Sequence, residues 1–228
     1  MSSPLMNFDE LYQGRGFDYG GTRMNVIPWQ LERPQPIVVE LADAGEITGP
    51  VLECGCGLGD NAVFLAGRGY DITAFDAAPT AIELDTAKAA AAGVSVRFLV
   101  ADATTLDGIP DGFHTVIDSA MLHCLDDDQR RAYLTGLLRV CVPGARLHVL
   151  CFRGDITSAF PLPAPLDEPS IRAAFPAGWT IERFQPRQYS TALTADAWDR
   201  ELPAGMAGDV DDDGHVLLPI WQITAMRD

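Results

Sequence analysis

One stretch constrains the fold of this chain more than any other: residues 51–60, with the sequence VLECGCGLGD. Apolar residues lead into an acidic residue and then into three glycines at alternate positions. This order predicts a buried parallel strand, a tight turn and the start of a helix. Glycine removes the side chain where a ligand must approach the backbone closely. The stretch therefore predicts an α/β domain with a ligand site at this turn.

Expected strands and helices alternate on both sides of the turn. The strands are expected at 51–53, 70–75, 94–100, 113–117 and 146–152, and the helices at 37–44, 62–66, 79–92 and 129–140. This alternation implies right-handed crossovers and a doubly wound parallel sheet. A turn is expected at Pro143-Gly144 and a short helix at 170–175. Two later strands, at 179–184 and 215–226, predict a hairpin-like edge of the sheet.

A single domain is expected for residues 1–228, because no linker-like stretch divides them. Residues 1–36 combine a short helical face, glycines, aromatic residues and an extended proline-rich end. They are interpreted as an N-terminal lid that closes over an apolar ligand, with a disordered tail as the alternative. Residues 37–152 form the expected ligand-binding core, and residues 153–228 the C-terminal strands and acceptor-side loops.

Charge and cysteine content disfavour several classes of partner. The net charge of −16, from 32 acidic and 16 basic residues, disfavours nucleic acids and anionic membranes. No run approaches the roughly 20 apolar residues that span a bilayer, and no signal peptide is recognisable. The five cysteines are an odd number in mostly apolar segments, which favours reduced thiols and a cytoplasmic location. The sequence leaves the oligomeric state open.

Four carboxylates follow four successive expected strands: Glu53, Asp76, Asp102 and Asp118. Ligands of open α/β sheets bind beyond the carboxyl ends of the strands, so one shared site is expected. The acid after the second strand can accept hydrogen bonds from both hydroxyls of a ribose. Asp102, together with the N–H of Ala103, can recognise the edge of an adenine. The four acids together favour an adenine nucleoside as the ligand.

The spacing of the glycines separates two classes of nucleoside. Dinucleotide-binding turns have the pattern G-x-G-x-x-G, whereas Gly55, Gly57 and Gly59 alternate here and are followed by Asp60. A carboxylate is unfavourable where a pyrophosphate would bind, and it favours a cationic amino-acid tail instead. A nicotinamide-dependent reductase on a similar sheet is therefore the less favoured alternative.

Taken together, these motifs resemble those of the class I S-adenosylmethionine-dependent methyltransferases. The matching segments are ECGCGLG at 53–59, Asp76, ADA at 101–103 and DSAMLH at 118–123, within residues 37–152. The proline-rich entry with Trp29 is similar to the thiopurine methyltransferase-like group. It is closer still to actinobacterial methyltransferases that act on heterocyclic toxins. The resemblance implies a Rossmann-like, three-layer αβα fold with seven strands, the last one antiparallel.

The resemblance also implies that the cofactor is S-adenosyl-L-methionine. It further indicates which residues bind this cofactor. These residues are Trp29, Glu53, Gly55, Cys56, Gly57, Asp76, Ala77, Asp102, Ala103 and Asp118. Asp76 would bind the ribose, Asp118 would lie under the methionine end, and Trp29 would cover the cofactor from the lid. Two positions depart from the usual pattern: Cys56 has no obvious duty in the turn, and Glu53 stands where many members have aspartate.

The implied reaction is an in-line displacement of a methyl group onto a nitrogen, oxygen or sulfur atom. The cofactor carries the difficult chemistry, while the protein aligns the reactants and excludes water. His123 is the candidate general base for a protonated nucleophile, with a packing or capping role as the alternative. Tyr19, Met24, His123 and Phe152 are the candidate acceptor-binding residues, and they are equally compatible with a core.

The predicted function is therefore methyl transfer to a small, largely apolar, aromatic or heteroaromatic acceptor. The alternative is a protein that binds S-adenosylmethionine or S-adenosylhomocysteine without catalysis, such as a sensor. No metal is expected. The acids at 209, 211 and 213 copy the opening of a calcium loop, but Ile220 stands where that loop needs glutamate. This segment is interpreted as an acidic turn before the last strand.

Overall fold

The computed structural model describes residues 7–19, 22–24, 26–154, 166–194 and 209–228, with only the backbone for 17–19 and 22–24. Its main strands are β3 (Val51–Cys54), β4 (Ile72–Asp76), β5 (Arg97–Val100), β6 (Phe113–Ser119), β7 (Cys141–Phe152), β8 (Trp179–Thr194) and β9 (His215–Arg227). They form one sheet in the order β5-β4-β3-β6-β7-β9-β8. Strands β3 to β7 pair in parallel, whereas β9 is antiparallel to both neighbours. The predicted doubly wound seven-stranded sheet with an antiparallel last strand is confirmed.

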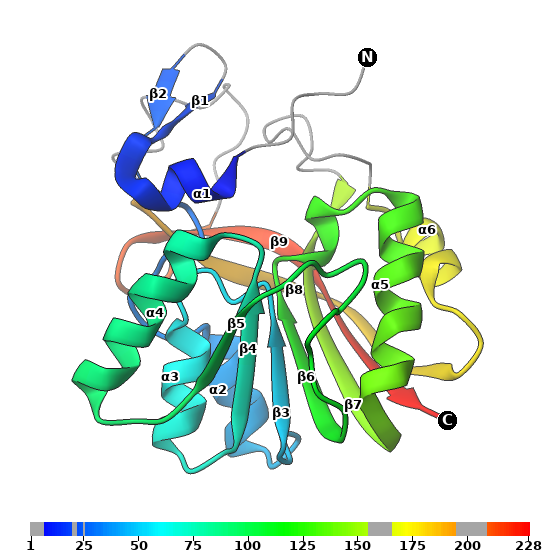
Figure 1. The fold of residues 1–228 in the computed structure, drawn as a ribbon. Helices are drawn as coiled ribbons and strands as arrows, with labels where there is room; N and C mark the ends of the chain where they lie inside the picture. The colour runs from blue at the N-terminus through cyan, green and yellow to red at the C-terminus, as the bar shows by residue number, and fades with distance from the viewer. Residues whose placement is uncertain (1–6, 20–21, 25, 155–165, 195–208) are drawn as a thin grey trace.

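Helices cover both faces of the sheet and give the molecule three layers (Figure 1). One face carries α2 (Pro36–Asp43), α3 (Asp60–Gly67) and α4 (Pro79–Ala92), and the other carries α5 (Asp127–Val140) and α6 (Glu168–Ala174). Each face has its own apolar core, one built around Leu134 and Leu137 of α5 and the other around Val38 and Leu65. Burial of these side chains is the main force that holds the layers together.

Local sequence explains where several helices begin and end. The Asp126 side chain accepts a hydrogen bond from the N–H of Gln129, and the Gln129 side chain accepts one from the N–H of Asp126, so α5 starts with a capping box. Pro79 occupies the first turn of α4, and Gly93 ends this helix in the left-handed conformation. These boundaries agree with the sequence expectations.

The expected turn at Pro143-Gly144 is wrong, because both residues lie inside β7. The strand pairs Cys141 with Phe113 and then Arg146 with Thr115, and the register shifts between these pairs. The strand therefore bulges where the proline stands. A bulge suits proline, since proline has no N–H to contribute to the hydrogen-bond ladder.

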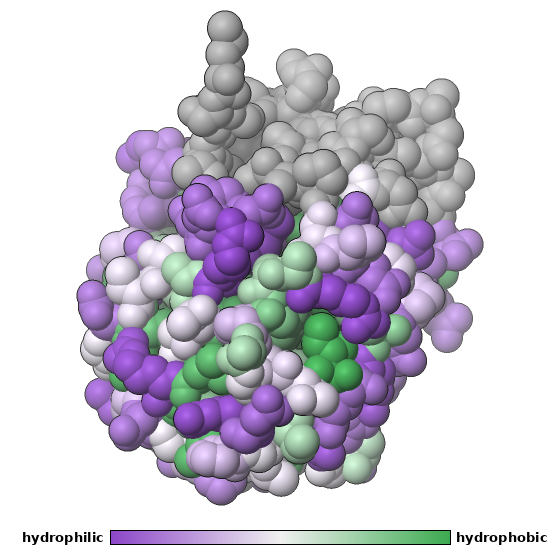
Figure 2. All heavy atoms as spheres, turned by 90° about the vertical axis from the view of Figure 1, so that its right-hand side faces the viewer, coloured by the Kyte–Doolittle hydropathy of each residue, from purple (hydrophilic) through white to green (hydrophobic). Residues whose placement is uncertain are grey.

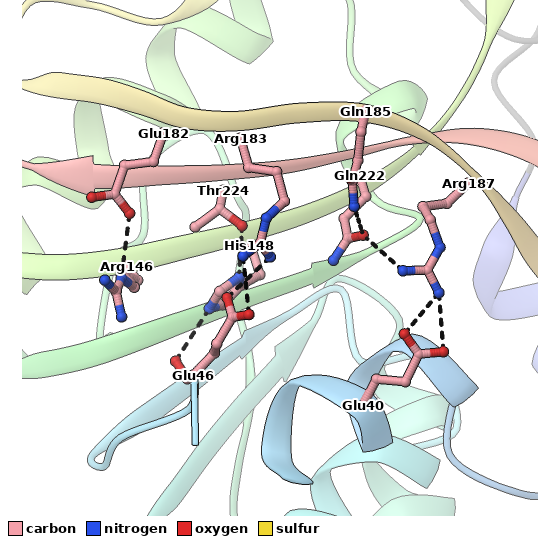
Figure 3. Close-up of polar contacts among 10 residues, drawn as sticks. All are labelled: Glu40, Glu46, Arg146, His148, Glu182, Arg183, Gln185, Arg187, Gln222 and Thr224. Carbon is pink, nitrogen blue, oxygen red and sulfur yellow. Dashed lines mark hydrogen bonds and ion pairs between the residues drawn. The ribbon is translucent and has the colours of Figure 1, made fainter. Parts of the chain in front are cut away.

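Strand β8 is longer than expected, since it continues past Phe184 to Thr194. This part of the strand contains polar residues, so its sequence lacks the apolar pattern that predicts a strand. Polar side chains of β8 extend toward α2 and the loop after it (Figure 3). Arg183 forms two 3.0 Å bonds with Glu46. Arg187 binds both carboxylate oxygens of Glu40, at 2.7 and 3.0 Å. The polar residues of β8 thus fasten α2 and the loop after it to the C-terminal strands.

The N-terminal segment lies beyond the carboxyl ends of the strands, above α4 in Figure 1. It consists of α1 (Phe8–Glu10), the π-helical turn η1 (Leu11–Arg15) and a hairpin of β1 (Phe17–Tyr19) and β2 (Thr22–Met24). The carboxylate of Asp9 accepts a 2.8 Å hydrogen bond from the N–H of Thr80 in the first turn of α4. The segment is therefore docked onto the core. The short helix was expected, and the hairpin was not.

Two further observations bear on the environment of the protein. Within the described ranges, no helix combines the length and the apolar character needed to cross a membrane. All five cysteines are free thiols, as expected of reduced residues.

On the face toward α5 and α6, hydrophobic and hydrophilic side chains are intermixed (Figure 2).

Candidate active site

The carboxyl ends of β5, β4, β3 and β6 form one edge, and the four predicted acids lie along it. In the pairing register, Cys54 at the end of β3 stands beside Asp118 of β6. Asp76 ends β4 one residue beyond the partner of Cys54, and Asp102 follows two residues after the end of β5. The predicted gathering of acids at one sheet edge is therefore present. The directions in which their side chains point decide what each can do.

The glycine turn after β3 leaves little or no room for a side chain at any of its three glycines. Gly55 has a φ of +62°, and a Cβ atom there would lie 2.7 Å from Cγ and 2.8 Å from Cβ of Met121. Gly57 has a φ of +56°, and a Cβ atom there would lie 3.1 Å from the hydroxyl oxygen of Tyr12. Gly59 has a φ of +64°, and a Cβ atom there would lie 2.8 Å from Cγ of Asp85. The backbone conformation favours glycine at all three positions, and packing excludes a side chain at Gly55 and Gly59.

Glu53 lies in β3 on the face toward α3 and is only 1% exposed. Its Oε1 atom accepts a 3.0 Å hydrogen bond from Asn61, while Oε2 has no partner among the described residues. Burial raises the pKa of the Glu53 carboxyl to about 8, and the charges of Asp85 and Asp60 add to this rise. The carboxyl has one unpaired oxygen, and an approaching cation would favour its ionised form.

Asp76 ties the end of β4 to the glycine turn. Its two carboxylate oxygens accept 2.9 Å hydrogen bonds from the N–H groups of Gly57 and Ala78. Burial raises the pKa of Asp76, and the backbone hydrogen bonds oppose this rise. A carboxylate can accept about four hydrogen bonds, so Asp76 keeps acceptor capacity for a ligand hydroxyl. Ala77, between the two bonded segments, is exposed.

Asp102 and Ala103 lie at the outer end of the same edge. Asp102 is exposed, and its Oδ1 atom accepts 2.7 Å hydrogen bonds from the N–H and the hydroxyl of Thr104. Ala103 is buried. This local turn fixes the chain direction after β5 and leaves Oδ2 of Asp102 without any recorded bond among the described residues.

Helix α4 supports the glycine turn from behind with charged residues. Lys88, the only lysine of the chain, donates hydrogen bonds to the carbonyl of Leu58 and, at 2.6 Å, to the carboxylate of Asp60. The Cys56 thiol donates to buried Asp85 at 3.4 Å, and burial raises the pKa of Asp85 to about 7. The side chain of Cys56 thus has a structural duty. Asp60, expected to favour a cationic tail, is paired with lysine instead.

Asp118 points to the opposite face of the sheet from Glu53, toward α5. Its side chain is fully buried, and Oδ1 accepts hydrogen bonds from the N–H groups of Met121 at 3.0 Å and Leu122 at 3.1 Å. These bonds hold the turn η2 (Leu122–Cys124). Burial raises the pKa of the Asp118 carboxyl to about 6. Oδ1 of Asp118 thus holds the backbone of the turn, whereas its buried Oδ2 has no hydrogen-bond partner among the described residues.

Aromatic rings gather beside η2 on the other side of the glycine turn. The rings of His123 and Phe152 lie 4.6 Å apart, and those of Phe152 and Tyr189 lie 5.4 Å apart. The Tyr189 hydroxyl is 3.3 Å from the Ser119 hydroxyl. Burial, with Arg130 nearby, lowers the pKa of His123 to about 3, so its imidazole is neutral at physiological pH. Nδ1 of His123 has no partner among the described residues.

The comparisons with known proteins agree with this geometry. The family described as "Methyltransferase domain" matches residues 51–144. The 2-heptyl-1-hydroxyquinolin-4(1H)-one methyltransferase of Mycobacteroides abscessus is 35% identical over 184 residues, or 78% of each chain. This chain belongs to the S-adenosylmethionine-dependent methyltransferases. The predicted class I family, its activity and its cofactor are thereby confirmed, against both the reductase and the non-catalytic alternative.

Solved structures support the same assignment. One solved structure comes from work on the conversion of a disulfide bond into a thioacetal group during echinomycin biosynthesis. Its sequence is 34% identical to that of this chain. It has a TM-score of 0.76, and the match covers 97% of this chain and 90% of that one. The magnesium protoporphyrin IX methyltransferase of Synechocystis, with S-adenosylhomocysteine bound, shares the fold. It has a TM-score of 0.59 at 19% identity, covering 84% of this chain and 80% of that one.

The residues of this methyltransferase fit its cofactor in two respects that the structure itself provides. The unpaired Oε2 atom of Glu53 is a buried acceptor that suits a cationic ammonium group. The turn at Gly55 and Gly57 brings backbone without side chains of its own to the carboxyl end of β3, where a ligand can approach closely. Both features lie at the carboxyl end of β3, beside the switch point between β3 and β6.

Two residues that lie at this edge, Tyr12 and Tyr189, were not identified from the sequence. Tyr12 lies over Gly57 and accepts a 3.1 Å hydrogen bond from the indole of Trp29, whose ring packs edge-on against Phe8. Tyr189 joins the aromatic group from the unexpected part of β8. The helical face of residues 8–12 was the only signal for Tyr12. The predicted acceptor residues Tyr19 and Met24 have side chains outside the described part of the chain.

One group of potential metal ligands lies away from this edge. Ligand atoms of Asp211, Asp213 and His215 lie within 4.8 Å of one another. Oδ1 of Asp211 accepts hydrogen bonds from the N–H groups of both other residues, and Arg33 approaches Asp211 to 3.1 Å. The acids thus form a closed turn before β9, as the sequence was interpreted. The absence of a metal remains a prediction.

Proposed function

We propose that this methyltransferase transfers a methyl group to a nitrogen, oxygen or sulfur atom of a small, largely apolar heteroaromatic molecule. The observation that carries the proposal is the group of His123, Phe152 and Tyr189 beside the glycine turn. Aromatic rings favour a flat, apolar acceptor, which stacks on them with little loss of conformational entropy. The relative from Mycobacteroides abscessus, named for a quinolone, supports the same class.

S-Adenosyl-L-methionine, when bound, supplies an electrophilic methyl group on a sulfonium sulfur. We assign the methionine part to Glu53 and to the backbone of Gly55, Cys56 and Gly57. Ionised Glu53 would bind the ammonium group and lose its raised pKa in doing so. We assign the ribose to Asp76, because its oxygens keep acceptor capacity after binding the backbone.

The adenine is assigned to Asp102 and the N–H of Ala103, with Ala77 along the path between ribose and base. Asp118 is assigned to the methionine end, where it also holds the turn through Met121 and Leu122. Trp29 and Tyr12 would cover the cofactor from the lid. Tyr19 and Met24 remain proposed acceptor contacts from the hairpin of that lid.

His123 is proposed to contact the acceptor as a neutral imidazole. Its low pKa makes it a weak base, so it accepts a hydrogen bond more readily than a whole proton. Such a group orients the nucleophile and lets an acidic hydroxyl or a neutral ring nitrogen react. Phe152 packs against His123 and keeps water from the reacting atoms.

The chain's own charge supports the proposal that the acceptor is a small molecule. A net charge of −16 repels nucleic acids and anionic membranes, and we propose neither as a partner. The free thiols support the proposed cytoplasmic location.

The proposal is tested by incubating the protein with S-adenosylmethionine and a panel of heterocycles, phenols and thiols. Release of S-adenosylhomocysteine is then measured for each compound. We expect acceptor-dependent release with at least one heteroaromatic compound, including hydroxyquinolones. Turnover with aliphatic thiols alone, or none with any aromatic compound, would contradict the proposed acceptor class.

A further inference from the structure

The turn η2 links the two sides of the site. At its start, Met121 packs against Gly55, which belongs to the glycine turn. In its middle, His123 lies against Phe152 of the aromatic group. A shift of η2 would therefore move Met121 on the cofactor side and His123 on the acceptor side together.

The backbone before η2 is held in an unfavourable conformation. Ala120 has a φ of +78°, a left-handed value that is unfavourable for a residue with a side chain. Its N–H donates to the carbonyl of Leu150 at 2.9 Å, and Asp118 binds the next two N–H groups. Strain of this kind persists only where the surroundings determine the conformation, and it clusters at functional sites.

Arg130 holds η2 from the other side. Its Nε atom donates a 3.2 Å hydrogen bond to the carbonyl of Leu122, and Nη1 donates a 3.0 Å bond to Asp127. The Arg130 side chain is 1% exposed, whereas that of Asp127 is 66% exposed. Nη2 of Arg130 has no partner among the described residues.

This arrangement is a costly way to achieve stability alone. Removing the Arg130 guanidinium from water is unfavourable. Its bonds to the exposed Asp127 and to the carbonyl of Leu122 offset only part of that free-energy cost. Apolar residues of similar volume often replace buried charges without loss of stability. The buried charge is thus better explained by what it positions.

We propose that Arg130 is a positioning residue for methyl transfer, which with Asp118 clamps η2 and so fixes Met121 against the glycine turn and His123 against the acceptor. Asp118 holds two N–H groups of the turn, and Arg130 holds a carbonyl of it. The inference rests on the proposed placement of His123 at the acceptor. Neither clamp residue touches the reacting atoms.

The chain offers a matched control in the next residue. Arg131 forms a similar pair with Asp128, three residues earlier on α5, at 2.6 Å. Both of these side chains are exposed, at 54% and 94%. Substitutions at 130 and 131 therefore remove the same chemical group from the same helix, once from the clamp and once from the surface.

The experiment compares the full chain with Arg130→Met, Arg130→Lys and Arg131→Met. Calorimetry gives the Kd of S-adenosylmethionine, and steady-state assays with 2-heptyl-1-hydroxyquinolin-4(1H)-one, or with an acceptor from the panel, give kcat and KM. Arg130→Met should lower kcat by roughly tenfold to a hundredfold, because small misplacements slow aligned reactions strongly. The Kd should rise by a smaller factor, about threefold to tenfold, because Met121 shifts against Gly55 while the proposed contacts of Glu53 and Asp76 stay. Arg130→Lys should recover part of kcat, and Arg131→Met should match the wild type.

Hydrogen exchange of the peptide covering 118–125 provides a readout that needs no acceptor. We expect faster exchange in Arg130→Met and unchanged exchange in Arg131→Met. A variant that melts earlier but keeps wild-type kcat and exchange would overturn the inference. Should Arg130→Met not fold, wild-type kcat and exchange in Arg130→Lys would overturn it. If the wild type methylates no aromatic acceptor, the proposed function fails, while the exchange result still decides whether Arg130 holds the turn.

Discussion

The proposed cofactor side and the proposed acceptor side of the site differ in how they are built. The cofactor side, around β3 and β4, consists of glycines and buried carboxyls within residues 53–85, held by backbone hydrogen bonds. The acceptor side consists of rings from η2, β7 and β8, spread over residues 123–189. On the cofactor side the pKa values of Glu53 and Asp85 are raised, and on the acceptor side the pKa of His123 is lowered.

Both shifts have the same origin, which is burial of an ionisable group. Their consequences are opposite. The carboxyls gain from an approaching cation, whereas the neutral histidine suits an uncharged or anionic acceptor. We infer that the first side is built to attract a positively charged ligand, and the second to keep charge away from an aromatic one. Substitutions on either side should therefore affect different steps.

The largest effect is expected from Gly55→Ala. The new Cβ would overlap Met121 and force a positive φ on alanine, so both the glycine turn and η2 would shift. Cofactor affinity should fall by more than about a hundredfold, as measured by calorimetry. Gly69→Ala is the control, because Gly69 has a φ of +87° but no neighbour within 4 Å of the added atom. It should lower the melting temperature and leave cofactor affinity unchanged; an equal loss of affinity would show that backbone strain alone is responsible.

The next effect tests the acceptor side. His123→Asn should lower kcat by roughly tenfold to a hundredfold, because the amide oxygen of asparagine is far less basic than the imidazole nitrogen that it replaces. Cofactor affinity should stay within about twofold, since His123 lies apart from the glycine turn. The rate with a phenol or a protonated heterocycle should fall more than the rate with a thiolate. Equal losses for both nucleophiles would contradict a role in handling the proton.

Asp76→Ala tests the cofactor side with a smaller change. Loss of contacts to the ribose and to the N–H of Gly57 should weaken cofactor binding by more than about tenfold. For the acceptor, KM should stay near its wild-type value once the cofactor is saturating. Unchanged cofactor affinity would remove Asp76 from the ribose site.

The smallest expected effect concerns pH. The folded-state pKa values of Glu53 and Asp85, about 8 and 7, lie above their unfolded values, so folding favours the protonated forms. Stability of the ligand-free protein should therefore fall as pH rises from 4 through 7 and 8, measured as the melting temperature. Affinity for the cationic cofactor should rise over the upper part of this range. Glu53→Gln should flatten both trends; a trend unchanged in this variant would assign it to another group.

Sequence reasoning reached most of the fold and the gathering of acids at one edge of the sheet. The glycine turn, Glu53 and Asp76 belong to short contiguous motifs at strand ends, where local pattern and final position coincide. The bulge at Pro143 was missed, because proline and glycine ordinarily indicate turns. The second part of β8 was missed as well, since Gln185, Arg187 and Gln188 interrupt its apolar pattern.

The acceptor side depends on contacts that no local pattern contains. Tyr189 meets Phe152 only through the sheet order, in which β9 separates β8 from β7. Tyr12 reaches Gly57 only because the N-terminal segment docks on α4. The alternation of side chains along β6 turns Asp118 toward α5, and its place under the methionine end of the cofactor stays a prediction. Strand-end position therefore predicts where an acid lies along the edge, but not the face to which it points.

The most direct test of the account is a single-turnover experiment with cofactor-saturated protein. S-Adenosylmethionine with an isotope-labelled methyl group is bound first, and 2-heptyl-1-hydroxyquinolin-4(1H)-one is then added. For the wild type we predict that the label appears on the quinolone in step with S-adenosylhomocysteine. For His123→Asn we predict the same bound cofactor with much slower transfer. Equally fast transfer in both proteins, or bound cofactor that never loses its methyl group to any heteroaromatic compound, would contradict the division of the site into a cofactor side and an acceptor side.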